Sequence, residues 1–122
     1  DVDELSQKYR GMVLCPWQLP KLKGNFQLAA NFISFQEMEP EVVQNYLSFI
    51  SALVTDYVLL RNSRYGKPKS NQPGQAGVLK PVMRQDYLDG LKLFELTSLD
   101  SRTFGWANNL GFESEVMVLK RK

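Results

Sequence analysis

The segment from Glu39 to Arg61 constrains the fold of this chain more than any other part of the sequence. Pro40 suits the first position of a helix, and Glu39 and Glu41 suit its positive end. Apolar side chains then recur every three or four residues, which is the spacing of one helix face. These residues are Val43, Tyr46, Leu47, Ile50, Leu53, Val54, Tyr57 and Leu60. The pattern predicts a helix over residues 39–61, about 35 Å long at 1.5 Å per residue.

This expected helix carries more apolar surface than one face can hold. Val42, Phe49, Val58 and Leu59 lie beside the main stripe. A helix that is apolar on several sides is buried on several sides. We therefore expect residues 39–61 to form the centre of a helical bundle, with a partner contact as the less favoured reading.

Residues 25–36 fit two kinds of element. Leu28 and Phe32 belong to a helical stripe but also to an alternating strand pattern. The neighbouring alanines Ala29 and Ala30 favour the helix. Further helices are expected over 1–10 and 81–96, and a small β element is possible near residues 11–15.

The clearest interruption of the apolar pattern covers residues 62–80. This segment contains three glycines, two prolines, two serines and two asparagines, and it has no acidic residue. Such a composition buries too little apolar area to order a chain. We expect a long, flexible, disordered loop that is basic because it carries Arg64, Lys67, Lys69 and Lys80.

Charge is distributed unevenly along the chain. Residues 1–62 carry 5 basic and 7 acidic side chains (net −2), and residues 63–122 carry 10 and 6 (net +4). A basic half can form a surface for nucleic acid, although small domains also scatter charge by chance. The candidate nucleic-acid contacts are Arg64, Lys67, Lys69, Lys120, Arg121 and Lys122.

The last segment, residues 101–122, predicts two short helices around a glycine turn. Ala107 lies four residues before Gly111, and Leu110 and Phe112 flank that glycine. In this respect the segment resembles the helix-turn-helix motif of DNA-binding proteins. The resemblance implies that Glu115, Val116, Leu119 and Lys120 of the second helix would face the groove of DNA. An ordinary helical hairpin that closes a bundle explains the same pattern and is preferred.

Two residue counts argue against catalysis. The chain contains no histidine and a single cysteine, Cys15. These counts exclude a Ser-His-Asp or Cys-His site and an internal disulfide, and a zinc site of carboxylates alone is improbable. The sequence also has neither a Walker-type phosphate loop nor a dinucleotide-binding fingerprint. We therefore expect no enzyme, no cofactor, no metal and no small-molecule substrate.

Together these patterns predict one mainly α-helical domain over residues 1–122, cut from a longer protein of the cytoplasm or nucleus. No apolar stretch is long enough to span a membrane. The expected function is non-catalytic binding of a protein partner or of a second copy. The candidate contact residues are Trp17, Phe49, Leu59 and Trp106. The alternative is a nucleic-acid-binding domain that uses the basic loop and the C-terminal hairpin.

Overall fold

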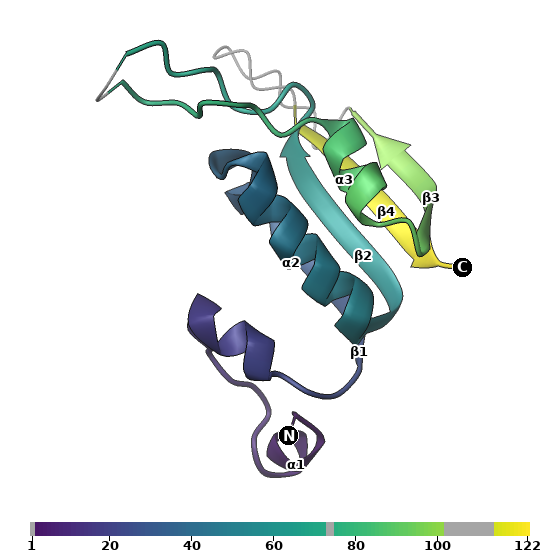
Figure 1. The fold of residues 1–122 in the computed structure, drawn as a ribbon. Coiled ribbons are helices and arrows are strands. Elements are labelled where there is room, and N and C mark those ends of the chain that lie inside the picture. Colours follow the sequence, from purple (N-terminus) through teal and green to yellow (C-terminus); the bar gives the residue numbers. More distant parts are fainter. Residues whose placement is uncertain (1, 73–74, 102–113) are drawn as a thin grey trace.

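The computed structural model describes residues 2–72, 75–101 and 114–122, and within these ranges it is an α/β fold (Figure 1). The α-helices are α1 (Val2–Lys8), α2 (Pro40–Leu53) and α3 (Arg84–Gly90). Two short 3-10 helices are η1 (Pro16–Lys21) and η2 (Ser34–Glu37). The strands are β1 (Phe26–Phe32), β2 (Val54–Ser63), β3 (Phe94–Asp100) and β4 (Ser114–Arg121).

The strands form one mixed sheet in the order β1-β2-β4-β3. β1 and β2 are parallel, whereas β4 is antiparallel to both of its neighbours. β2 and β3 therefore run in the same direction with β4 between them. Two connections join strands of like direction, β1 to β2 through α2 and β2 to β3 through α3.

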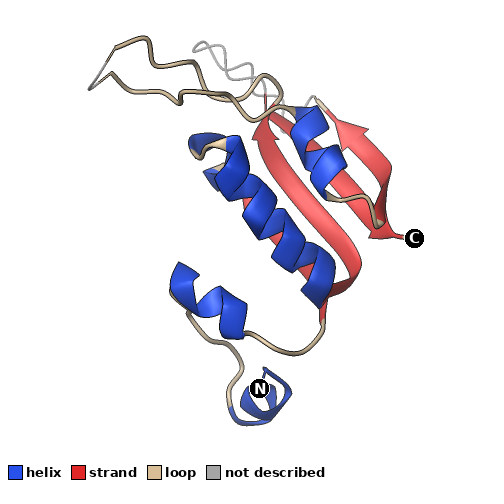
Figure 2. Ribbon diagram, in the orientation of Figure 1, coloured by secondary structure: helices blue, strands red, loops and turns tan. Residues whose placement is uncertain are grey.

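α2 and α3 lie over the same face of the sheet (Figure 2). Crossovers between parallel strands are nearly always right-handed, and both crossovers here advance in the same direction across the sheet. They must therefore place α2 and α3 on one side. The buried side chains of β2 and β4 alternate accordingly, with Val58, Leu60, Met117 and Leu119 turned toward the helices.

The core lies between this face and the two helices. α2 contributes Val43 and Leu47, and α3 contributes Tyr87, all with 1% or less of their surface exposed. Gly90 lets the end of α3 approach α2 closely, because a Cβ at this position would lie 2.5 Å from Leu47 Cδ1.

The predicted helical bundle is wrong, chiefly because the expected helix over 39–61 is two elements. The helix ends at Leu53, and the chain continues directly as β2. Val54, Thr55, Tyr57 and Val58 are β-branched or aromatic residues that favour a strand. A strand buried between two neighbours reads as a continuous apolar run, which periodicity alone does not separate from a buried helix.

In three further segments, residues that were predicted to be helical form strands. Residues 25–36 contain β1, so the alternating strand pattern was the correct one of the two. The expected helix over 81–96 is shorter, since α3 ends at Gly90 and β3 begins at Phe94. The predicted second helix of the C-terminal hairpin is β4, and residues 102–113 lie outside the described ranges. The short helix expected near the N-terminus is confirmed as α1.

Parts of the segment 62–80 are ordered, although its composition predicts a disordered loop. Asn62 and Ser63 belong to β2, and Val78 is buried with 4% of its surface exposed. The backbone N–H of Ser70 donates to the Val78 carbonyl at 2.9 Å, and a single bridge pairs Lys69 with Val78. Flexibility of the remaining loop stays a prediction. Residues 11–15 form no strand.

Candidate functional site

The carboxyl ends of β1 and β2 meet in a cluster of polar side chains. Asn31, near the end of β1, accepts a hydrogen bond from Asn62 Nδ2 of β2 at 3.3 Å. Asn31 Nδ2 donates to Ser34 Oγ at 2.6 Å, and Asn62 Oδ1 accepts from the backbone N–H of Gln36 at 3.3 Å. Gln36 Oε1 in turn accepts from the backbone N–H of Ser63. These contacts tie the turn after β1 to the end of β2.

The turn after β1 contains a strained residue. Ile33 has φ 70° and ψ −33°, a conformation that a β-branched side chain rarely adopts. Its backbone N–H donates to the Arg61 carbonyl at 2.7 Å, which holds it beside β2. Such strain persists only when surrounding contacts enforce it, and it concentrates at binding sites. The turn 31–36 is therefore a candidate ligand-contacting segment.

Two glutamates hold the loop after β2 over this end of the sheet. Both carboxylate oxygens of Glu39 accept backbone N–H groups, from Leu79 at 2.8 Å and from Lys80 at 3.1 Å. Glu37 pairs with the ammonium group of Lys67. The loop is thus attached to the segment that follows β1, and these carboxylates are already engaged.

A partly buried ion pair lies at the start of β4, next to this end of the sheet. Glu115 has 2% of its side chain exposed and accepts two hydrogen bonds from the Arg84 guanidinium, at 2.8 and 2.6 Å. The hydrogen bond to Glu115 raises the pKa of Arg84, against a smaller opposing effect of desolvation. Arg64 Nε lies 3.8 Å from the same carboxylate. Two guanidinium groups therefore converge on one buried acid.

Tyr87 lies in the core below this pair. Its hydroxyl is buried and has no hydrogen-bond partner among the described residues, and its ring stacks on Phe35 at 6.4 Å. Burial raises the pKa of the Tyr87 phenol, and the nearby charges of Asp86 and Glu115 raise it further.

We expect Tyr87→Phe to change how stability depends on alkaline pH. The folded state disfavours the phenolate, whereas an unfolded tyrosine has a pKa near 10. Below about pH 10, Tyr87 is neutral in both states and does not make stability depend on pH. Above it, the unfolded tyrosine ionises and the folded one does not, so the free energy of unfolding falls by about 1.4 kcal/mol per pH unit. Urea unfolding of both proteins at pH 8, 10 and 11 should show the free energy of unfolding of wild type falling relative to that of the variant as pH rises. Parallel profiles would contradict this, and Tyr9→Phe, at an exposed ring, is the control.

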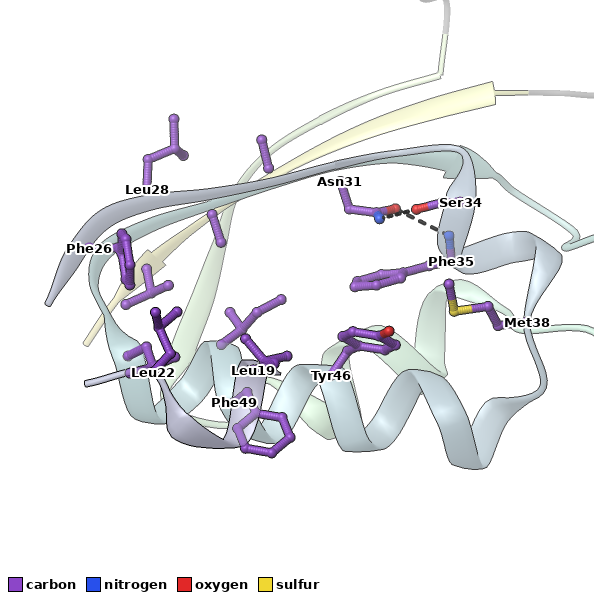
Figure 3. Close-up of a pocket in the computed structure, with 15 residues that line it drawn as sticks. Leu19, Leu22, Phe26, Leu28, Asn31, Ser34, Phe35, Met38, Tyr46 and Phe49 are labelled. Atoms are coloured by element: carbon purple, nitrogen blue, oxygen red, sulfur yellow. Dashed lines mark hydrogen bonds between the residues drawn. The ribbon is translucent and has the colours of Figure 1, made fainter. Parts of the chain in front are cut away.

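An apolar groove runs from the polar cluster along β1, between this strand, η1 and α2 (Figure 3). Its volume is about 470 Å³, within the range of small-molecule pockets. Asn31 and Ser34 supply polar atoms at one end, where the Phe35 and Tyr46 rings lie 5.7 Å apart. Apolar side chains line the rest, including Leu19, Leu22, Phe26, Phe49, Ile50 and Leu53.

No protein-family model matches the sequence, and no match was found among curated protein sequences. Solved structures do match in fold. Magnesium protoporphyrin IX methyltransferase from Synechocystis PCC 6803, solved with bound S-adenosylmethionine, superposes with a TM-score of 0.60 at 13% identity. The match covers 85% of this chain and 43% of that enzyme. An S-adenosylmethionine-dependent methyltransferase from Clostridium acetobutylicum ATCC 824 has a TM-score of 0.60 at 8% identity, covering 96% of this chain and 67% of that one.

What the chain shares with these proteins is the fold. This likeness overturns the prediction of a non-catalytic helical interaction domain, because the shared architecture is an α/β fold rather than a helical bundle. The prediction of no enzyme is contradicted as well, because the solved structures that share the fold are methyltransferases. The match spans less than half of the Synechocystis enzyme. The activity of that enzyme is therefore not carried over to this chain by the likeness alone.

The six basic residues predicted to contact nucleic acid do not gather on one surface. β2 and β4 are antiparallel, with Ser63 opposite Ser114 and Tyr57 opposite Lys120. Residues 64–69 therefore follow one end of the sheet, and residues 120–122 lie at the other. Arg64 and Lys67 contact Glu115 and Glu37 as described above.

The C-terminal basic residues are similarly engaged, apart from the exposed Lys120 of β4. Arg121 donates to the carbonyls of Ser51 and Val54, and Lys122 Nζ donates to the Lys92 carbonyl. β4 is a strand, so the helix-turn-helix alternative is also wrong. Lys69, on the loop, is exposed.

The predicted partner-binding residues are dispersed as well. Trp17 on η1 has 74% of its surface exposed, and Phe49 on α2 lines the groove. Leu59 lies in the middle strand β2, opposite Ala30 and Val118. Trp106 lies outside the described ranges.

The polar cluster itself was missed by the sequence analysis. Its signal was asparagine and serine near the ends of apolar runs: Asn31 and Ser34 at the end of the first run, and Asn62 and Ser63 after Arg61 at the end of the second. Within residues 2–72, 75–101 and 114–122, no group of three acidic or cysteine side chains is placed to bind a metal ion. In the same ranges, no helix is long and apolar enough to cross a bilayer.

Proposed function

We propose that this chain forms part of an S-adenosylmethionine-dependent methyltransferase and contributes one wall of its ligand site. The observation that carries the proposal is the polar turn 31–36 at the carboxyl ends of the parallel pair β1 and β2. Open α/β sheets bind ligands at the carboxyl ends of their parallel strands. The methyltransferase fold of the matching structures supports the same placement.

The residues present suit such a ligand. Amide and hydroxyl groups at Asn31 and Ser34 match neutral polar groups such as a ribose, and the adjoining groove suits an apolar or aromatic body. When bound, the cofactor supplies an activated methyl group for transfer. The nearby Glu37, Glu39 and Glu115 are all occupied by cations or backbone N–H groups. In this proposal the chain's own residues orient the ligands rather than accept a proton.

An intracellular setting, in the cytoplasm or nucleus, is part of this proposal. Cys15 is exposed and forms no disulfide, which suits a reducing compartment.

Binding of S-adenosylmethionine tests the function. Titration calorimetry would use the 122-residue chain and the natural polypeptide that carries it. We expect binding that Ser34→Ala weakens about tenfold, because one lost hydrogen bond to a bound ligand is worth about 1.4 kcal/mol. Ser34 is exposed, so this change should leave the fold intact.

Gln27→Ala provides the matched control, since Gln27 is an exposed polar residue near the other end of β1. It should leave the affinity unchanged. No binding by either polypeptide would overturn the proposed function. Binding that is equally insensitive to both substitutions would overturn the placement of the site.

A further inference from the structure

The hydrogen bonds around Asn31 fix which way its side-chain amide faces. Asn31 Oδ1 accepts from the backbone N–H of Phe35 at 3.3 Å (Figure 3). The same oxygen accepts from Asn62 Nδ2 at 3.3 Å. A backbone N–H can only donate, so the Asn31 atom that faces Phe35 is the oxygen. The Asn31 nitrogen therefore lies on the side of Ser34.

The orientation of the Asn62 amide is fixed in the same way. Asn62 Oδ1 accepts from the backbone N–H of Gln36 at 3.3 Å, so Nδ2 is the atom that faces Asn31. Asn62 is 1% exposed, which keeps solvent from replacing these contacts. Two backbone N–H groups thus set the direction of a chain of hydrogen bonds that runs from Asn62 through Asn31 to Ser34.

This chain of hydrogen bonds ends in donors at the polar end of the groove. Ser34 Oγ accepts from Asn31 Nδ2 at 2.6 Å, and its own O–H has no acceptor within residues 2–72, 75–101 and 114–122. The second hydrogen on Asn31 Nδ2 also has no acceptor in these ranges. Each hydrogen bond in such a series polarises the next, which makes the Ser34 hydroxyl a stronger donor. Two donors and one remaining lone pair therefore face a ligand here, and they favour an acceptor group.

The charges around this end of the groove restrict the acceptor further. The described residues that line the groove are all uncharged. The first charged side chains after Ser34 in the sequence are the acids Glu37 and Glu39. Glu37 pairs with Lys67, and Glu39 accepts two backbone N–H groups. A carboxylate or phosphate would thus lose its water without gaining a cation from the lining, which is unfavourable.

We propose that Asn31 and Ser34 recognise an uncharged oxygen acceptor on a ligand whose apolar or aromatic part lies in the groove. Two sources supply such an oxygen, the ribose of the cofactor and a carbonyl group of the molecule to be methylated. In both cases Asn31 and Ser34 position the ligand, and the buried Asn62 orients them. This recognition rests on the ligand site of the proposed function, but not on the identity of its cofactor.

Three small probes of nearly the same shape test this recognition in the natural polypeptide. Acetophenone carries a carbonyl oxygen, and α-methylstyrene has a methylene group in its place. Benzoate has the same ring with an anionic carboxylate. NMR titrations that follow the side-chain amide of Asn31 and the backbone amide of Phe35 give the three dissociation constants.

The informative quantity is the ratio of the acetophenone affinity to the α-methylstyrene affinity, compared between variants. Ser34→Ala should lower this ratio about fivefold, the effect of one net hydrogen bond. Gln27→Ala is the matched control and should leave the ratio unchanged. Benzoate should bind wild type more weakly than acetophenone does. The recognition is overturned by an equal ratio in wild type and Ser34→Ala, by an equal fall in both variants, by tighter binding of benzoate, or by no binding of any probe.

Repeating the titrations with S-adenosylmethionine at saturation separates the two sources of the oxygen. Displacement of acetophenone assigns the donors to the ribose of the cofactor, and an unchanged affinity ratio assigns them to a carbonyl group of the methylated molecule. Calorimetry tests the proposed function separately. A polypeptide that shows the carbonyl preference but binds no S-adenosylmethionine contradicts the proposed function alone. One that binds S-adenosylmethionine without the preference contradicts the acceptor recognition alone.

Discussion

Replacing Arg84 by methionine should lower the free energy of unfolding by about 2 kcal/mol, because it removes one partner of a partly buried ion pair and leaves the Glu115 carboxylate buried. Methionine retains much of the apolar stem but none of the charge. Glu115 would keep a carboxylate that is 2% exposed and would lose both of its short hydrogen bonds. Arg64, at 3.8 Å and more exposed, compensates only in part. Urea unfolding at pH 7 measures the loss.

A double-mutant cycle separates the ion pair from other effects of the substitution. Glu115→Gln alone should also destabilise, because Arg84 then faces a neutral amide. The combined variant should be more stable than the sum of the single losses predicts, since neither charge is left alone. Arg64→Met should cost less than Arg84→Met. Additive single losses, or a larger effect at Arg64, would show that the Glu115–Arg84 contact is not what stabilises the start of β4.

The location of this ion pair explains why the sequence did not reveal it. Arg84 and Glu115 are 31 residues apart in the sequence, and only the packing of α3 over β4 brings them together. The glycine-turn pattern predicted Glu115 in the second helix of a hairpin, which would face DNA only under the helix-turn-helix alternative. In the structure, the alternation of β4 turns Glu115, Met117 and Leu119 into the interior. A period-two pattern over Ser114–Arg121 was present, but the glycine turn before it favoured a helical reading.

The ambiguity between helix and strand also explains why the overall fold was predicted wrongly. The sequence correctly placed a helix that begins at Pro40, because proline and the flanking acids mark a helix start. It did not place its end, because Leu53 is followed by further apolar residues rather than by glycine or proline. β2 is paired on both sides and buried on one face. Its sequence is therefore as rich in apolar residues as that of α2, and composition alone does not separate the two elements.

The candidate site could not be predicted from the sequence for a related reason. Asn31 and Asn62 become neighbours only through the parallel pairing of β1 with β2. If residues 25–36 are predicted to be a helix, nothing in the sequence indicates that these two side chains are close in space. The basic residues, which the sequence does reveal, lie at opposite ends of β4 and form no common surface. Four of the six residues, Arg64, Lys67, Arg121 and Lys122, are engaged in intramolecular contacts instead.

The other large effect is expected at Leu47, the residue on which α2 and α3 meet. Leu47 is 0% exposed, and Leu47→Ala should lower the free energy of unfolding by about 3 kcal/mol through lost burial and a residual cavity. Val42→Ala on the same helix is the control. Val42 is 46% exposed, and its substitution should change stability by less than about 0.5 kcal/mol.

Gly90 allows this contact to be tested from the other side. An alanine Cβ at position 90 would lie 2.5 Å from Leu47 Cδ1, so Gly90→Ala should destabilise wild type by about 1–3 kcal/mol through overpacking. In the Leu47→Ala background that atom is gone, and the one remaining contact at 2.5 Å is with Gln44 Oε1, at the end of a flexible side chain. Gly90→Ala should therefore cost less there than in wild type, by at least about 1 kcal/mol in the coupling free energy. Equal costs in both backgrounds would mean that α3 does not rest on Leu47. The crossover from β2 to β3 would then be positioned by other contacts, such as the hydrogen bond from Gln44 Nε2 to the Asp86 carbonyl at 2.7 Å.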